Sequence, residues 1–139
     1  MSAISQINIE DWSVTPTVVK TLQPVQNSPK AIWKGTDPAV PAIGQIQTEI
    51  SVIEGKANDP LRRVQLMVTV PHLEAQSSSG SSAGYVAAPK IAHIGKVKIE
   101  FILNNRATPA DNWTLQQFAY NFLNNPAVLD AVKFGIRPT

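Results

Sequence analysis

Polar side chains at even spacings mark three segments of this chain. The set consists of Gln45, Gln47 and Glu49 in one segment, Arg63, Gln65 and Thr69 in the next, and Lys96 and Lys98 in the last. Side chains two residues apart in an extended strand share one face of a sheet. Lys and Arg neutralise phosphates, while Gln and Thr form hydrogen bonds with base edges and sugars. We therefore interpret the set as a candidate surface for single-stranded RNA.

A plainer interpretation of the same set is the solvated polar face that antiparallel sheets commonly have. Few aromatic residues accompany the set, so it lacks the base-stacking pairs that many RNA-binding sheets carry. Recognition of RNA would then rest on polar contacts, with bases in small pockets.

One serine lies in a sequence that matches a nucleophile elbow. Residues 80–84 read Gly-Ser-Ser-Ala-Gly, but they lie in a Ser/Gly tract that no helical pattern follows. No acidic residue stands between Ser82 and the only later histidine, His93, although the elbow chemistry needs an acid and a histidine in that order. A hydrolase that uses Ser82 is therefore a distant alternative.

Metal and cofactor chemistry have little support in the residue types. His72 and His93 are the only histidines, and the chain has no cysteine, so the clustered ligands of a structural zinc site are missing. We interpret both histidines as core or loop residues. No P-loop and no dinucleotide-binding glycine motif occurs, and we expect no cofactor and no metal.

Three predicted strands would position the polar set. Residues 44–52, 63–70 and 91–103 alternate apolar and polar side chains, as half-buried strands do. Turn-forming residues at 55–60 predict that the first two strands form a hairpin. Residues 72–88 contain a Ser/Gly tract and predict a flexible loop before the last strand.

The ends of the chain follow other patterns. Prolines crowd residues 16–41 and exclude a helix there, which leaves short strands, including residues 18–25 and 31–34. Residues 108–135 predict two short helices in tandem, the first capped by Thr108 and the second stopped by Gly135. Short amphipathic helices depend on packing, so these helices must cover the sheet or a partner.

Composition favours one domain, residues 1–139, with an ordinary globular core. Twelve Lys and Arg oppose ten Asp and Glu, and a net charge of +2 is too small to identify a nucleic-acid binder by itself. The first twelve residues lack a basic start and a continuous apolar run, and no stretch approaches the length of a spanning helix. We expect a soluble protein made inside the cell.

The order of these elements resembles one known family. The elements that carry the resemblance are Val68–Pro71, a long loop, Ala87–Pro89, the strand Lys96–Asn104 and the two helices. Together they look like the coat proteins of single-stranded RNA bacteriophages, the leviviruses, over about residues 44–135. The resemblance implies an α+β fold with an N-terminal β-hairpin, a five-stranded antiparallel sheet and two C-terminal helices. In the family, these helices interlock in a dimer that has a continuous ten-stranded sheet.

The resemblance also implies a function. Dimers would close into an icosahedral capsid around the single-stranded RNA genome, with the polar set facing the RNA and residues 72–88 at the symmetry axes. RNA-hairpin binding that represses replicase translation would belong to the same surface.

We therefore expect a structural protein and not an enzyme. Its partners would be further copies of itself and viral RNA, with no membrane and no small-molecule substrate. It would be found in the virion after assembly in the cytoplasm of the bacterial host. The main alternative is a non-capsid protein that binds single-stranded nucleic acid.

Overall fold

A computed structural model of the chain describes residues 4–75 and 88–137. It divides into two compact units. The first unit comprises Met1–Glu54 and Arg63–Ile102, and the second comprises Gly55–Arg62 and Leu103–Thr139. The first unit therefore holds most of the sheet, and the second holds a turn between two strands and both helices.

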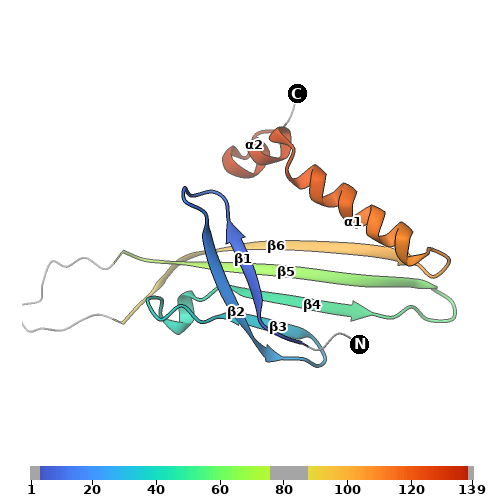
Figure 1. The fold of residues 1–139 in the computed structure, drawn as a ribbon, viewed down its shortest axis with the longest axis horizontal. Coiled ribbons are helices and arrows are strands. Elements are labelled where there is room, and N and C mark those ends of the chain that lie inside the picture. The colour runs from blue at the N-terminus through green and yellow to red at the C-terminus, as the bar shows by residue number, and fades with distance from the viewer. Residues whose placement is uncertain (1–3, 76–87, 138–139) are drawn as a thin grey trace, which may run out of the picture. The chain divides into compact units, whose positions relative to one another are not determined.

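The sheet is a six-stranded antiparallel meander in which each strand pairs with its neighbours along the chain (Figure 1). A short 3₁₀ turn, η1 (Ala42–Gly44), lies between the third and fourth strands. The strands are β1 (Ile7–Asp11), β2 (Val18–Gln26), β3 (Ala31–Gly35), β4 (Gln47–Ile53), β5 (Leu61–Leu73) and β6 (Ile91–Asn104). The strands predicted from alternation are confirmed, with shifts of a few residues at their ends.

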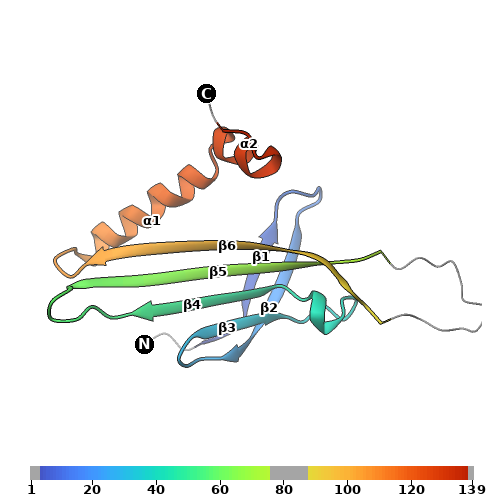
Figure 2. The ribbon, with the colours of Figure 1, turned by 180° about the vertical axis from the view of Figure 1, so that it is seen from behind.

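The N-terminal hairpin joins the sheet, which differs from the expected five strands preceded by a hairpin. Leu22 of β2 pairs with Ile7 of β1 on one side and with Gly35 of β3 on the other. Because β2 is paired along both edges, β1 and β2 count as strands of one sheet. The register shifts between Pro24 and Gln26. Seen from behind in Figure 2, β1 and β2 run steeply across the direction of β4, β5 and β6.

The predicted loop after β5 begins later than expected. β5 continues to Leu73, so His72 lies in a strand and not in the loop predicted for residues 72–88. The ladder between β4 and β5 ends at the pair Gln47 and Thr69. Pro71 therefore lies past the end of β4, where its missing N–H leaves no β4 partner unsatisfied. Residues 76–87, including Ser82 and its neighbours, lie outside the described residues.

The core of the sheet lies where β2, β3 and β4 meet. Leu22 is fully buried, and Trp33 and Thr48 are 7% and 8% exposed. Trp33 and Thr48 are direct cross-strand partners, so they share one face of the sheet. The indole Nε1 of Trp33 also donates a hydrogen bond of 2.7 Å to the carbonyl oxygen of Ser5. This contact ties the segment before β1 to the core.

Two helices follow β6, as predicted: α1 (Pro109–Leu123) and α2 (Pro126–Phe134). At the start of α1, Asp111 N–H donates to Thr108 Oγ1 at 3.2 Å, and Thr108 N–H donates back to Asp111 Oδ2 at 2.9 Å. These hydrogen bonds form a capping box, and those from the Thr108 backbone and hydroxyl lower the pKa of Asp111. Gly135 ends α2 in a left-handed conformation with a φ of 66°.

The helices expose their apolar side chains. No residue of α1 or α2 is buried. The exposed fractions of the large side chains are 65% for Trp113, 69% for Phe118, 67% for Phe122, 79% for Val132 and 68% for Phe134. Among residues 4–75 and 88–137, neither helix is long and apolar enough to cross a membrane. Exposed apolar area of this kind marks an interaction surface.

Candidate nucleic-acid interface

The register between β4 and β5 brings the predicted polar residues to one face of the sheet. Gln47 pairs with Thr69, and Ser51 pairs with Gln65. Direct cross-strand partners share a face, and each strand alternates, so Glu49 and Arg63 lie on the same side. We call this side the polar face. The predicted grouping of these residues on two strands is confirmed.

β6 contributes its lysines to the same face. The Arg63 guanidinium lies 3.8 Å from the carboxylate of Glu100, and the rings of His72 and His93 stack with centroids 4.4 Å apart. Arg63 and His72 are an odd number of residues apart on β5, and so are His93 and Glu100 on β6. The two contacts therefore mark opposite faces of the sheet. Because Lys96 and Lys98 have the parity of Glu100, they lie on the polar face.

One cation of the polar face was missed by sequence reasoning. Lys34 of β3 pairs directly with Gln47, and Gln23 of β2 pairs with Lys34. A row of polar side chains therefore crosses β2, β3, β4 and β5. Five residues of strand give little periodicity, and nearby prolines hide the register, so only the alternation of Trp33 and Lys34 could have indicated this position.

The carboxylates of the polar face are occupied within the protein. Glu49 accepts a 2.9 Å hydrogen bond from Gln47 Nε2 and forms a 3.5 Å ion pair with Lys30, and its side chain is 16% exposed. Glu100 partly neutralises Arg63. For Lys34, Lys96 and Lys98, the described part of the chain supplies no hydrogen-bond or ion-pair partner. Lys96 and Lys98 are also exposed, so they are the cations most available to an anionic polymer.

Gln45 is placed differently from the rest of the predicted set. It lies before β4 begins, and its Nε2 donates hydrogen bonds of 2.7 Å to the carbonyl oxygens of Asp37 and Val40. The strand alternation that assigned it to the polar face does not extend to this turn. Both donors of its amide are used to hold the segment between β3 and β4.

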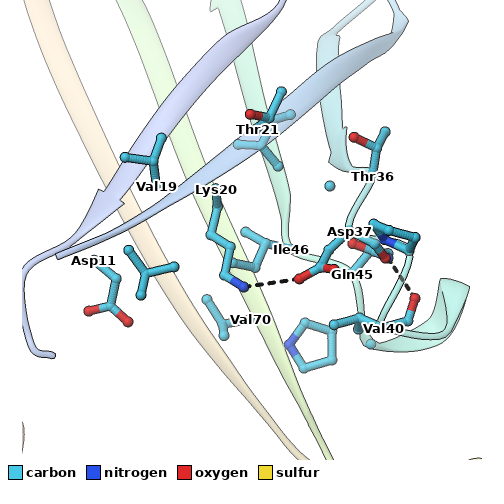
Figure 3. A pocket seen from close by; sticks show the side chains of 16 residues that line it. Asp11, Val19, Lys20, Thr21, Thr36, Asp37, Val40, Gln45, Ile46 and Val70 are labelled. Atoms are coloured by element: carbon cyan, nitrogen blue, oxygen red, sulfur yellow. Dashed lines mark hydrogen bonds and ion pairs between the residues drawn. The ribbon is translucent and has the colours of Figure 1, made fainter. Parts of the chain in front are cut away.

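A cavity of about 550 Å³ lies beside this segment, as Figure 3 shows. Lys20 and Asp37 line it and form an ion pair of 3.2 Å. The pKa of Asp37 is lowered by the N–H of Ala39 and, next, by Lys20. Asp11 also lines the cavity and accepts hydrogen bonds from Ser13, which lower its pKa. Each of these three charged groups is held by an ion pair or a hydrogen bond within the protein, and this arrangement indicates a structural role.

The described residues bring no three metal-ligating side chains together. No group of three or more His, Cys, Asp or Glu occurs among residues 4–75 and 88–137. The nucleophile-elbow sequence around Ser82 lies outside these residues. The polar face is thus the best-supported candidate site.

Comparison by sequence finds no relative: no family model and no curated protein matches this chain. Comparison by structure does. The chain is similar to a virus-like particle of bacteriophage ESE058, with 18% identity, 99% of this chain and 100% of the other covered, and a TM-score of 0.84. It is similar to the capsid protein of bacteriophage GA, with 17% identity, 93% of each chain covered and a TM-score of 0.70.

A third similar structure is the coat protein of bacteriophage EMS014, with 26% identity and a TM-score of 0.68. That match covers 88% of this chain and 74% of the other. The structures that share this fold are coat proteins and virus-like particles of single-stranded RNA phages, which are structural proteins and not enzymes. The chain has the coat-protein fold, and the expected α+β class is confirmed.

Proposed function

We propose that this protein is a coat subunit that assembles into a closed shell around single-stranded RNA. The observation that carries the proposal is the match of its fold, over 99% of the chain, to a subunit of a virus-like particle. The exposed apolar surface of the chain supports it. A subunit that leaves Phe118, Phe122 and Val132 about two-thirds or more exposed needs partners to cover them.

The first partner is a second copy of the chain. β6 is the last strand of the sheet, 14 residues long, and no strand among the described residues pairs with its outer edge. An unpaired edge of this length is a template for another strand. Its side chains Val97 and Ile102 are 52% and 54% exposed. Two copies would join their β6 edges into one continuous sheet, and their helices would interlock on the side away from the RNA.

The second partner is RNA, which the polar face would bind. Lys34, Lys96 and Lys98 would neutralise phosphates, together with Arg63. Gln47, Gln65 and Thr69 would supply hydrogen bonds to bases or sugars, while Glu49 would hold Gln47 in place. A hairpin of the genome would bind the same face, and its binding would repress translation of the replicase. Assembly would take place in the cytoplasm of the bacterial host and lead to a virion.

Electron microscopy of the purified recombinant protein tests assembly. Uniform icosahedral particles that contain RNA are the expected result. Dimers alone, over a range of salt and protein concentrations, would contradict the coat proposal and favour a non-capsid protein that binds single-stranded nucleic acid. Particles that form without nucleic acid would support assembly into a shell and contradict the assignment of the polar face to RNA.

A separate experiment tests repression. A reporter whose translation start lies in a hairpin from the source genome is expressed with and without the protein. We expect reduced reporter synthesis that a scrambled hairpin abolishes. Equal reporter synthesis with the intact and the scrambled hairpin would limit the polar face to general packaging of RNA.

A further inference from the structure

The two histidines of the chain lie together, although a connection of seventeen residues, 74–90, separates their strands. His72 is the penultimate residue of β5 and His93 is the third residue of β6. Their rings stack with centroids 4.4 Å apart and an angle of 20° between the ring planes. Both side chains are exposed. The pair lies on the side of the sheet opposite the polar face, so it is not part of the RNA surface.

We propose that His72 and His93 form a bidentate site for one divalent transition-metal ion of the zinc, copper or nickel class. Imidazole nitrogen is a preferred ligand of these ions. In a tetrahedral site with metal–nitrogen distances near 2.05 Å, two ligand nitrogens lie about 3.3 Å apart. In the stack the ring planes differ by only 20°, so the in-plane lone pairs run roughly parallel, and the rings must turn before one nitrogen of each can bind a shared ion. Because both side chains are exposed, rotation about their side-chain torsions is open to them and would unstack the rings around the ion.

The backbone joins the two strands close to the histidines. The N–H of Glu74, the residue after β5, donates a hydrogen bond of 2.9 Å to the carbonyl oxygen of Lys90, the residue before β6. Two ligands fixed on paired strands behave as one chelating group, because the second ligand binds at high effective concentration. Water would complete the coordination, since the described residues offer no third His, Cys, Asp or Glu in the cluster.

A bound ion would fasten the end of β5 to the start of β6. This clamp would act where the chain leaves and re-enters the sheet, and it does not depend on the coat proposal. The site therefore predicts a metal-dependent gain in thermal stability.

Calorimetric titration of the full chain with Zn²⁺ tests the site. We expect one ion per chain, and we expect His72→Gln and His93→Gln each to weaken binding about 100-fold. The matched control is Ile94→Gln, an exposed neighbour of His93 on the polar face, which should bind as the unaltered protein does. Binding that survives both histidine variants, or that Ile94→Gln weakens equally, would overturn the proposal.

Electron paramagnetic resonance with Cu²⁺ gives a readout that does not depend on a variant's folding. The unaltered protein should show coupling to two imidazole nitrogens at one equivalent of copper. Coupling to a single imidazole nitrogen, or no bound copper, would contradict a shared site. The melting temperature should rise with Zn²⁺ in the unaltered protein and in Ile94→Gln, and should stay constant in both histidine variants.

Discussion

β3 and β6 both carry apolar side chains on the side of the sheet opposite the polar face, yet these side chains end in different surroundings. Trp33 of β3 is 7% exposed, because β2 and β4 flank it and Leu22 and Thr48 are buried near it. Val97 of β6 is 52% exposed. Alternation therefore tells which face of a strand is apolar, but not whether the same chain covers that face. The difference separates a folding core from a surface for partners.

The largest expected effect comes from the buried member of this comparison. Trp33→Ala removes a packed indole and its hydrogen bond to Ser5, so it should lower the free energy of unfolding by about 3–5 kcal/mol. Val97→Ala should cost far less in the separated subunit, since Val97 is half exposed there. Urea denaturation at a fixed protein concentration measures both. An equal loss of unfolding free energy in the two variants would contradict the difference in burial between Trp33 and Val97.

Val97 of β6, the exposed residue in this comparison, should matter for assembly. Val97→Asp places a charge on a surface that a second copy would cover, so dimers and particles should be lost while the far-ultraviolet circular dichroism of the subunit is kept. Val97→Ile, which stays apolar, is the control and should assemble. Analytical ultracentrifugation measures both variants. If Val97→Asp assembled at the same concentration as the unaltered protein, β6 would not be buried between copies.

The polar face offers a smaller effect that leaves the shell intact. Lys96→Glu combined with Lys98→Glu reverses two cations that have no partner in the described part of the chain, so packaged RNA should fall severalfold. The double Arg variant at the same positions keeps the charge and should package normally. The ratio of absorbance at 260 and 280 nm in purified particles reports the RNA content. An unchanged ratio would argue against RNA contact at β6.

The smallest effect is expected at the start of α1. Thr108→Ala removes the helix cap and should cost about 1 kcal/mol of unfolding free energy. The pKa of Asp111 is lowered in the folded protein, so the stability it contributes is present above its ordinary pKa of 3.8 and is lost as the pH falls further. Denaturation midpoints between pH 5 and pH 2.5 should therefore fall less steeply in Asp111→Asn than in the unaltered protein. If the midpoints of the two proteins fell in parallel with pH, Asp111 would not stabilise the helix start.

Much of the polar face could be predicted, because a two-residue period needs only correct strand assignments. The register between β4 and β5 confirms the grouping of Gln47, Gln65 and Thr69. Lys34 was missed because a strand of five residues near prolines gives no reliable register. Gln45 was assigned by extending the alternation of β4 into a turn, where the backbone no longer alternates. Period-based reasoning fails where strands are short or have ended.

Contacts across the sheet were harder to predict than faces. The stack of His72 and His93 depends on the register between β5 and β6, and a long connection leaves that register open in the sequence. The number of strands in the sheet was also mispredicted because the sequence does not show which strands pair. Whether a hairpin precedes a sheet or joins it depends on the second edge of β2, which the sequence does not mark.

The strictly sequential order of the strands bears on how the chain reaches its fold. Each strand pairs only with its neighbours along the chain, so most pairings close short loops and carry a small entropic cost. The connection between β5 and β6 is the longest, so we expect this pairing to nucleate last. β6 would take its place last. A subunit would thus complete its own sheet shortly before offering the outer edge of that final strand to another copy, which would limit premature association of half-folded chains.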